Sequence, residues 1–166
     1  MLIGPLFEDL EFWAVYMRMK EEGAQIRVIG TKVGEVHPSK SGGLQAETQV
    51  ASSQIGSKDL DALLIPGGFA PDKMRRDPHM LRLIRDMDQE GKILGFICHG
   101  GWMAASAKIL GGRKFTGSLG IRDDLENAGG IWVDEPAFQE GNIVWGRVVE
   151  DIPDYNRALV KALSAT

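Results

Sequence analysis

The stretch of the sequence that most constrains the fold is residues 93–105, where an apolar run is followed directly by Cys98, His99 and two glycines. Residues 93–97 have the length of a buried strand, and the Ala- and Met-rich residues after Gly101 are typical of a helix. The pattern predicts a nucleophile elbow, in which a cysteine lies between strand and helix and glycines let the backbone approach the reacting atom. The N–H groups at the start of the helix favour a thiolate, so we expect Cys98 to be reactive.

Strand and helix patterns alternate along the rest of the chain. Helices are expected at residues 8–22, 71–74, 78–89, 121–127 and 153–163, besides the helix after Gly101. Strands are expected at residues 1–4, 26–30, 61–66, 93–97, 115–116, 132–133 and 143–145, with the last two joined through residues 140–142 and a short hairpin or arm within residues 31–58. This alternation predicts an α/β fold with an open, mostly parallel sheet.

The composition excludes several classes of protein. With 166 residues, of which 43% are hydrophobic and 25% charged, the chain is expected to form one globular domain spanning residues 1–166. A net charge of -4 argues against a nucleic-acid partner. The N-terminal residues lack the features of a signal peptide, no apolar run has membrane-spanning length, and one cysteine cannot form an internal disulfide. We therefore expect a cytoplasmic protein with no membrane partner.

The expected sheet brings three segments together, because ligands of such sheets bind at the carboxyl ends of the strands. These segments are the loop after the first strand, the loop after residues 61–66 and the elbow. They carry Glu8, Gly67, Gly68, Asp72, Cys98, His99 and Gly100. A carboxylate, a thiol, an imidazole and glycine loops with free N–H groups are the parts of a site for nucleophilic cysteine chemistry on a carbonyl group.

Each candidate also has a purely structural interpretation. Cysteine is often simply buried, and Glu8 or Asp72 could be a carboxylate that stabilises the first turn of a helix. Phe69 and Trp102 are large residues beside the motifs, so they line the pocket or belong to the core.

Nothing in the sequence indicates a metal or a cofactor. His37 and His79 have no clustered ligand spacing around them. The glycine pairs match neither a dinucleotide-binding loop nor a phosphate-binding loop. We therefore expect a site without metal or cofactor.

Five motifs together resemble the ThiJ/PfpI family, and most of all its PfpI-type intracellular protease branch, within the class I glutamine amidotransferase-like superfamily. They are Phe-Glu-Asp at residues 7–9, Leu-Ile-Pro-Gly-Gly at 64–68, Ile-Cys-His-Gly at 97–100, Gly-Gly-Arg-Lys at 111–114 and Gly-Ile-Arg-Asp-Asp at 120–124. The resemblance extends from about residue 4 to the C-terminal helix.

The resemblance implies a flavodoxin-like three-layer sandwich. It implies that Cys98 is the nucleophile, that Glu8 hydrogen-bonds the sulfur, and that the backbone amides of Gly68 and His99 form an oxyanion hole. In the PfpI branch an acid of a neighbouring subunit orients the histidine, and the matching residue is Asp72. A homo-oligomer, either a dimer or a hexamer, is therefore expected.

Several functions remain open on this evidence. One is a cysteine hydrolase acting on peptides, and another is a glyoxalase or deglycase acting on small reactive aldehydes, either with a role in stress. A non-enzymatic redox sensor or chaperone-like protein would use an oxidisable Cys98 instead. An inactive member retained for assembly is a further alternative, because Asp72 is shorter than the branch's glutamate and Ser118 replaces a pocket tyrosine.

Overall fold

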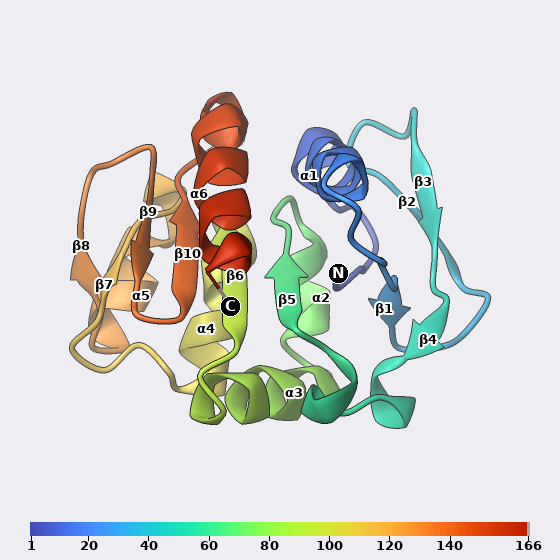
Figure 1. The fold of residues 1–166 in the computed structure, drawn as a ribbon, viewed down its shortest axis with the longest axis horizontal. Coiled ribbons are helices and arrows are strands. Elements are labelled where there is room, and N and C mark those ends of the chain that lie inside the picture. The colour runs from blue at the N-terminus through green and yellow to red at the C-terminus, as the bar shows by residue number, and fades with distance from the viewer. Residues whose placement is uncertain (166) are drawn as a thin grey trace.

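A four-stranded sheet of order β5-β6-β10-β9 forms the centre of the structure, a computed structural model that describes residues 1–165 (Figure 1). The parallel strands are β5 (Ala62–Ile65), β6 (Ile93–Ile97) and β10 (Ile143–Gly146), and β9 (Ala137–Glu140) pairs antiparallel with β10. All residues of β6 are buried, which explains why this run is continuously apolar. The predicted mostly parallel sheet is confirmed.

Short strands extend the sheet on the side of β5. The N-terminal residues bridge the two parts, because the amide of Leu2 donates to the carbonyl of Leu64 and that of Ile3 donates to Ile29, both at 2.9 Å. Beyond them β1 (Ile29–Gly30) pairs parallel with β4 (Val50–Ala51). An antiparallel hairpin of β2 (Val36–Pro38) and β3 (Gln45–Glu47) forms the arm predicted within residues 31–58.

Helices cover both faces of the sheet. On one face α1 (Asp9–Glu21) packs against α6 (Ile152–Ser164), which crosses β6 and β10. On the other face lie α2 (Ala70–Met74), α3 (Pro78–Gln89), α4 (Gly101–Ala107) and α5 (Arg122–Asn127), with α3 and α4 against β6. Figure 1 shows α1 and α6 towards the viewer and α2, α4 and α5 behind. The expected three layers are confirmed, and no helix within residues 1–165 has the length and apolarity needed to cross a bilayer.

Two details of the chain differ from the sequence prediction. The strand expected at residues 132–133 does not join β10. Instead β8 (Ile131–Trp132) pairs with β7 (Lys114–Phe115) in a separate parallel pair, and β9 supplies the strand before the turn at residues 140–142.

The second detail is the face of α1 that is buried, because it does not consist of apolar residues alone. Leu10 and Met17, two large apolar residues of this helix, are 51% and 59% exposed. The residues that α1 buries are Glu11, Phe12, Val15 and Met19. An acidic side chain therefore lies on the face that packs against the sheet.

Candidate active site

Cys98 lies at the end of β6, on the expected elbow. Its backbone has a φ of +56°, a left-handed conformation that costs a non-glycine residue about 1–3 kcal/mol. A short 3-10 turn, Cys98–Gly100, then leads into α4. A Cβ on Gly100 would come within 2.6 Å of the carbonyl oxygen of Ile65, so the turn is pressed against the end of β5. Strain held by such packing is typical of functional positions.

The loop of Gly67 and Gly68 lies between the start of α1 and the elbow. Gly68 has a φ of +75°, and a Cβ there would come within 2.4 Å of the amide nitrogen of Glu8. A Cβ on Gly67 would lie 2.6 Å from Glu11 Oε2 and 2.8 Å from the amide nitrogen of His99. The three segments that carry the candidate residues therefore meet, as the fold class predicts.

Glu11 acts on the Cys98 sulfur more strongly than Glu8 does, because its carboxyl has the larger effect on the pKa of the thiol. Glu8 is the N-cap of α1, and its Oε2 accepts hydrogen bonds from the amides of Leu10 and Glu11, both at 2.8 Å. Glu11 is 1% exposed, its Oε2 accepts a hydrogen bond from the amide of Gly67 at 2.7 Å, and its Oε1 is buried without a hydrogen-bond partner among the described residues. The carboxyl is close enough to Cys98 to raise the pKa of the thiol. In this structure Glu8 does not hydrogen-bond the sulfur as expected, because a side chain at the cap position turns back onto the first amides of its own helix.

Burial sets the protonation of the pair. It raises the pKa of Glu11 to about 8, an effect that the hydrogen bond from Gly67 opposes. It also raises the pKa of the Cys98 thiol, and the Glu11 carboxyl adds to this rise. The N–H groups at the start of α4 favour a thiolate, as the sequence predicts, but desolvation and the neighbouring carboxyl outweigh them. Near neutral pH we therefore take the resting pair as a protonated carboxyl beside a thiol.

His99 reaches back to the cysteine that precedes it. Its Nδ1 lies 3.3 Å from Cys98 Sγ, which is within hydrogen-bond distance for sulfur. Adjacent side chains usually point apart, but the left-handed backbone at Cys98 turns the two towards each other. Burial lowers the pKa of His99, and the positive charge of Lys40 lowers it further, so the imidazole favours its neutral form.

Asp72 makes its contacts on α2. Its Oδ2 accepts a hydrogen bond from Arg76 Nη2 at 2.8 Å and lies 3.8 Å from Lys73 Nζ. Within the described chain no contact joins Asp72 to His99. A role for Asp72 beside an imidazole would therefore need a second copy of the chain.

Phe69 and Trp102, two of the expected pocket residues, differ in exposure and in contacts. Phe69 follows Gly68 and is 61% exposed, with Lys40 Nζ 5.9 Å from its ring centre. Trp102, in the first turn of α4, meets the His99 ring edge to face, with ring centres 5.4 Å apart. Phe69 is exposed near the loop, and Trp102 is partly buried against the core.

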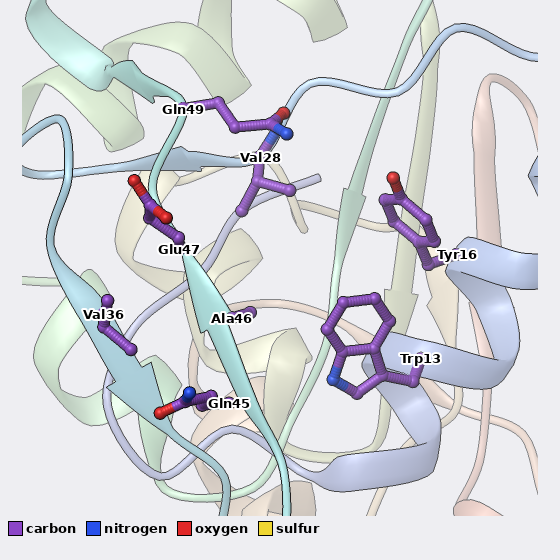
Figure 2. A pocket seen from close by; sticks show the side chains of 8 residues that line it. All are labelled: Trp13, Tyr16, Val28, Val36, Gln45, Ala46, Glu47 and Gln49. Carbon is purple, nitrogen blue, oxygen red and sulfur yellow. The ribbon is translucent and has the colours of Figure 1, made fainter.

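A separate cavity of about 300 Å³ lies between α1 and the β2–β3 arm. Figure 2 shows Trp13 projecting from α1 towards Ala46 on β3, with Tyr16 beside it on the same helix. The lining of this cavity includes none of the residues around Cys98.

Sequence reasoning missed Glu11 because several acids stand in the same turn. A signal was present, since Glu11 shares one helical stripe with Val15 and Met19 at spacings of four residues. An acid on an otherwise apolar stripe is either buried with a partner or costly, so its position indicates a functional or paired carboxyl.

Known proteins resemble this chain along nearly its whole length. The sequence profile described as the DJ-1/PfpI family matches residues 1–162. Deglycase PfpI of Pyrococcus furiosus is 36% identical over 157 residues, covering 95% of this chain and 93% of that protein. General stress protein 18 of Bacillus subtilis is 38% identical over 152 residues, covering 91% and 88%. A solved ThiJ/PfpI domain protein from Brachyspira murdochii superimposes with a TM-score of 0.93 at 22% identity, covering 99% of this chain and 94% of that one, which bears on the fold alone.

Proposed function

The chain belongs to the DJ-1/PfpI family, and on this premise we propose that it is a cofactor-independent enzyme of the glyoxalase or deglycase type. Cys98 would attack the carbonyl carbon of reactive aldehydes or of their adducts with amino groups. The observation that carries the proposal is the buried Glu11 carboxyl, which lies with Cys98 and His99 around Gly67, while His99 Nδ1 lies 3.3 Å from the Cys98 sulfur. Relatives named deglycases support it.

The first step is addition of the thiol to the aldehyde. The bond from Sγ to the carbonyl carbon forms, the carbonyl π bond breaks, and the thiol proton passes through His99 to the oxygen. The backbone amides of Gly68 and His99 are suited to stabilise that oxygen. For an aldehyde already attached to an amine, the carbon–sulfur bond replaces the carbon–nitrogen bond and the proton leaves with the amine.

The second step moves a proton within the adduct. With methylglyoxal, ionised Glu11 takes the proton from the former aldehyde carbon and returns one to the neighbouring carbon, which converts the hemithioacetal into a lactate thioester. Water then releases lactate and restores the thiol, so methylglyoxal and water give lactate and a proton without any oxidant. A carboxyl with a pKa of about 8 suits this role because it both loses and gains a proton near neutral pH.

The electrostatics favour aldehydes over peptides as substrates. Peptide cleavage by a cysteine enzyme relies on a thiolate and an imidazolium that protonates the leaving amine. Burial here raises the pKa of Cys98 and lowers that of His99, so both groups favour their neutral forms. Reversible addition of a thiol to an activated aldehyde requires neither a resting thiolate nor a resting imidazolium.

The test compares methylglyoxal consumption and lactate release by wild type, Cys98→Ala and Glu11→Gln, with a chromogenic peptide amide as second substrate. We expect turnover of methylglyoxal that Cys98→Ala abolishes, and little cleavage of the peptide. Full activity of Cys98→Ala would refute nucleophilic catalysis. Cleavage of the peptide alone would favour the hydrolase.

A second candidate is peroxide sensing. The chain has one cysteine, which lies beside a carboxyl that can donate a hydrogen bond to an oxidised sulfur, and a relative is named a general stress protein. Two molecules of hydrogen peroxide would oxidise the thiol to a sulfinic acid, each being reduced to water. Selective gain of two oxygen atoms at Cys98, without detectable turnover of methylglyoxal, would favour this function.

We further propose that the protein acts as a homo-oligomer in the cytoplasm, where its thiol stays reduced. In that assembly Asp72 of one copy would lie beside His99 of the next and hold its proton. The half-exposed position of Asp72 on α2 supports the idea, since a carboxylate there can exchange its Arg76 partner for a group on another chain.

A further inference from the structure

Trp102 holds the imidazole of His99 from within the same chain. The two rings meet at 78° with centres 5.4 Å apart, an edge-to-face arrangement. Trp102 stands on the first turn of α4, three positions after His99, so the backbone fixes the distance between them. On the other side of the imidazole, Nδ1 faces Cys98 Sγ at 3.3 Å.

The indole is itself held by polar contacts. Its Nε1–H donates to Asp124 Oδ2 on α5 at 2.8 Å. The guanidinium of Arg75 lies over the ring, with Cζ 5.3 Å from its centre. Arg75 is fixed in turn, because its Nε donates to Ser106 Oγ on α4 at 2.8 Å. Residues after α2, on α4 and on α5 thus converge on one ring.

We infer that Trp102, fixed by Asp124 and Arg75, is a positioning residue that keeps His99 Nδ1 directed at the Cys98 sulfur. The inference rests on the proposed function, because that function requires proton transfer between the Cys98 sulfur and the His99 imidazole. It assigns to the chain itself a part of the orienting role that the resemblance gives to Asp72 of a neighbour.

A simple packing role does not account for the contacts of Trp102. A core indole is surrounded by apolar side chains, whereas this ring is only partly buried and meets an imidazole, a guanidinium and a carboxylate. The imidazole can rotate about two side-chain bonds, and Trp102 packs against it while its Nδ1 faces the thiol. Removing the indole would free that rotation.

The chain offers a matched control in Trp132. Arg122 lies over this ring with Cζ 5.4 Å from its centre, and Phe115 meets it edge to face at 5.5 Å. Trp132 therefore has the same kinds of contact as Trp102, but none with His99. A general effect of losing a tryptophan should appear equally in Trp132→Leu.

The experiment measures the side-chain ¹⁵N shifts of His99, the rate at which iodoacetamide alkylates Cys98, and kcat and KM for methylglyoxal. We expect Trp102→Leu to change the tautomer ratio of His99 and to lower kcat about 10- to 100-fold, with KM within about threefold of wild type. Trp132→Leu should leave these quantities as in wild type. Equal effects of the two variants, or a wild-type tautomer ratio in Trp102→Leu, would overturn the inference.

Asp124 variants test the same inference with the indole in place. Asp124→Leu removes the acceptor of the indole N–H, and Asp124→Asn keeps an oxygen there, so Asp124→Asn should recover most of the kcat that Asp124→Leu loses. Similar losses in both variants would count against the inference. The ¹⁵N shifts and alkylation rates need no turnover, so a wild-type protein inert towards methylglyoxal would refute the proposed function and still leave the positioning of His99 tested.

Discussion

The carboxyl of Glu11 accepts a hydrogen bond from the backbone amide of Gly67 at 2.7 Å, across 56 positions of the sequence. This contact fixes the first turn of α1 to the glycine loop after β5. The hydrogen bond from Gly67 lowers the pKa of Glu11, and the Glu11 carboxyl raises the pKa of the Cys98 thiol. The same hydrogen bond therefore influences the protonation of both groups. The Glu11 carboxyl therefore links the helix, the glycine loop and the elbow.

The pH dependence of stability should reveal the buried carboxyl. Glu11 has a pKa of about 8 in the fold against 4.5 in an unfolded chain, so the folded state binds more protons between these values. Stability from this group is complete below about pH 4.5 and is lost as the pH rises, by about 5 kcal/mol once it passes 8. Glu11→Gln does not ionise, so urea unfolding across this range should show it gaining on wild type with rising pH. A constant difference would contradict a buried, titrating Glu11.

Glu8 and Glu11 should differ in the property that each controls. Glu8→Ala removes the N-cap of α1 and should cost about 1 kcal/mol of unfolding free energy. Glu11→Gln removes a negative charge beside the sulfur, so the pKa of Cys98 should fall and alkylation at alkaline pH should accelerate. Glu21→Ala, at the far end of the same helix, is the control for both measurements. A larger effect of Glu8 than of Glu11 on alkylation would restore the original assignment.

The parts of the fold that could be predicted were those fixed by local patterns. The strand at residues 93–97 is apolar throughout because both of its faces are covered, and the acids at the start of α1 and the glycine after it bound that helix closely. Pairing of β8 with β7 could not be predicted, since a two-residue strand carries almost no periodic signal. The turn at residues 140–142 was identified, but the strand before it, β9, is only partly buried and lacks an apolar run.

The candidate site was predictable only as a meeting of segments. Topology brings the elbow, the glycine loop and the start of α1 together whatever their side chains do. The choice between two acids three residues apart depends on where the helix begins, and a shift of one residue turns a side chain by 100° around the axis. The Trp102 contacts with Asp124 and Arg75 join residues of separate elements, so no local pattern indicates them.

Gly68 should be intolerant of any side chain. Gly68→Ala combines a φ of +75° with a Cβ 2.4 Å from the amide nitrogen of Glu8, so the loop must move. Gly112 has a φ of +73° with open space around it, and Gly112→Ala should therefore cost only the backbone strain, about 1–2 kcal/mol. We expect Gly68→Ala to be clearly more destabilised in urea unfolding and to lose activity. An equal loss of unfolding free energy in the two variants would show that the close contact between Gly68 and the start of α1 does not affect stability.

Mixing two inactive variants should decide whether Asp72 acts across an interface. Cys98→Ala lacks the nucleophile and Asp72→Asn lacks the orienting acid, so each alone should have low activity. If Asp72 serves the site of a partner, a hybrid dimer of the two variants contains one complete site. Random mixing makes half of the dimers hybrid, with one of their two sites complete, so about a quarter of wild-type activity should return after refolding the variants together.

Recovery of activity requires exchange of subunits, which mass measurement of the mixture verifies. No recovery in a verified hybrid would limit Asp72 to its own chain, and full activity of Asp72→Asn alone would remove it from the mechanism and leave the orientation of His99 to Trp102.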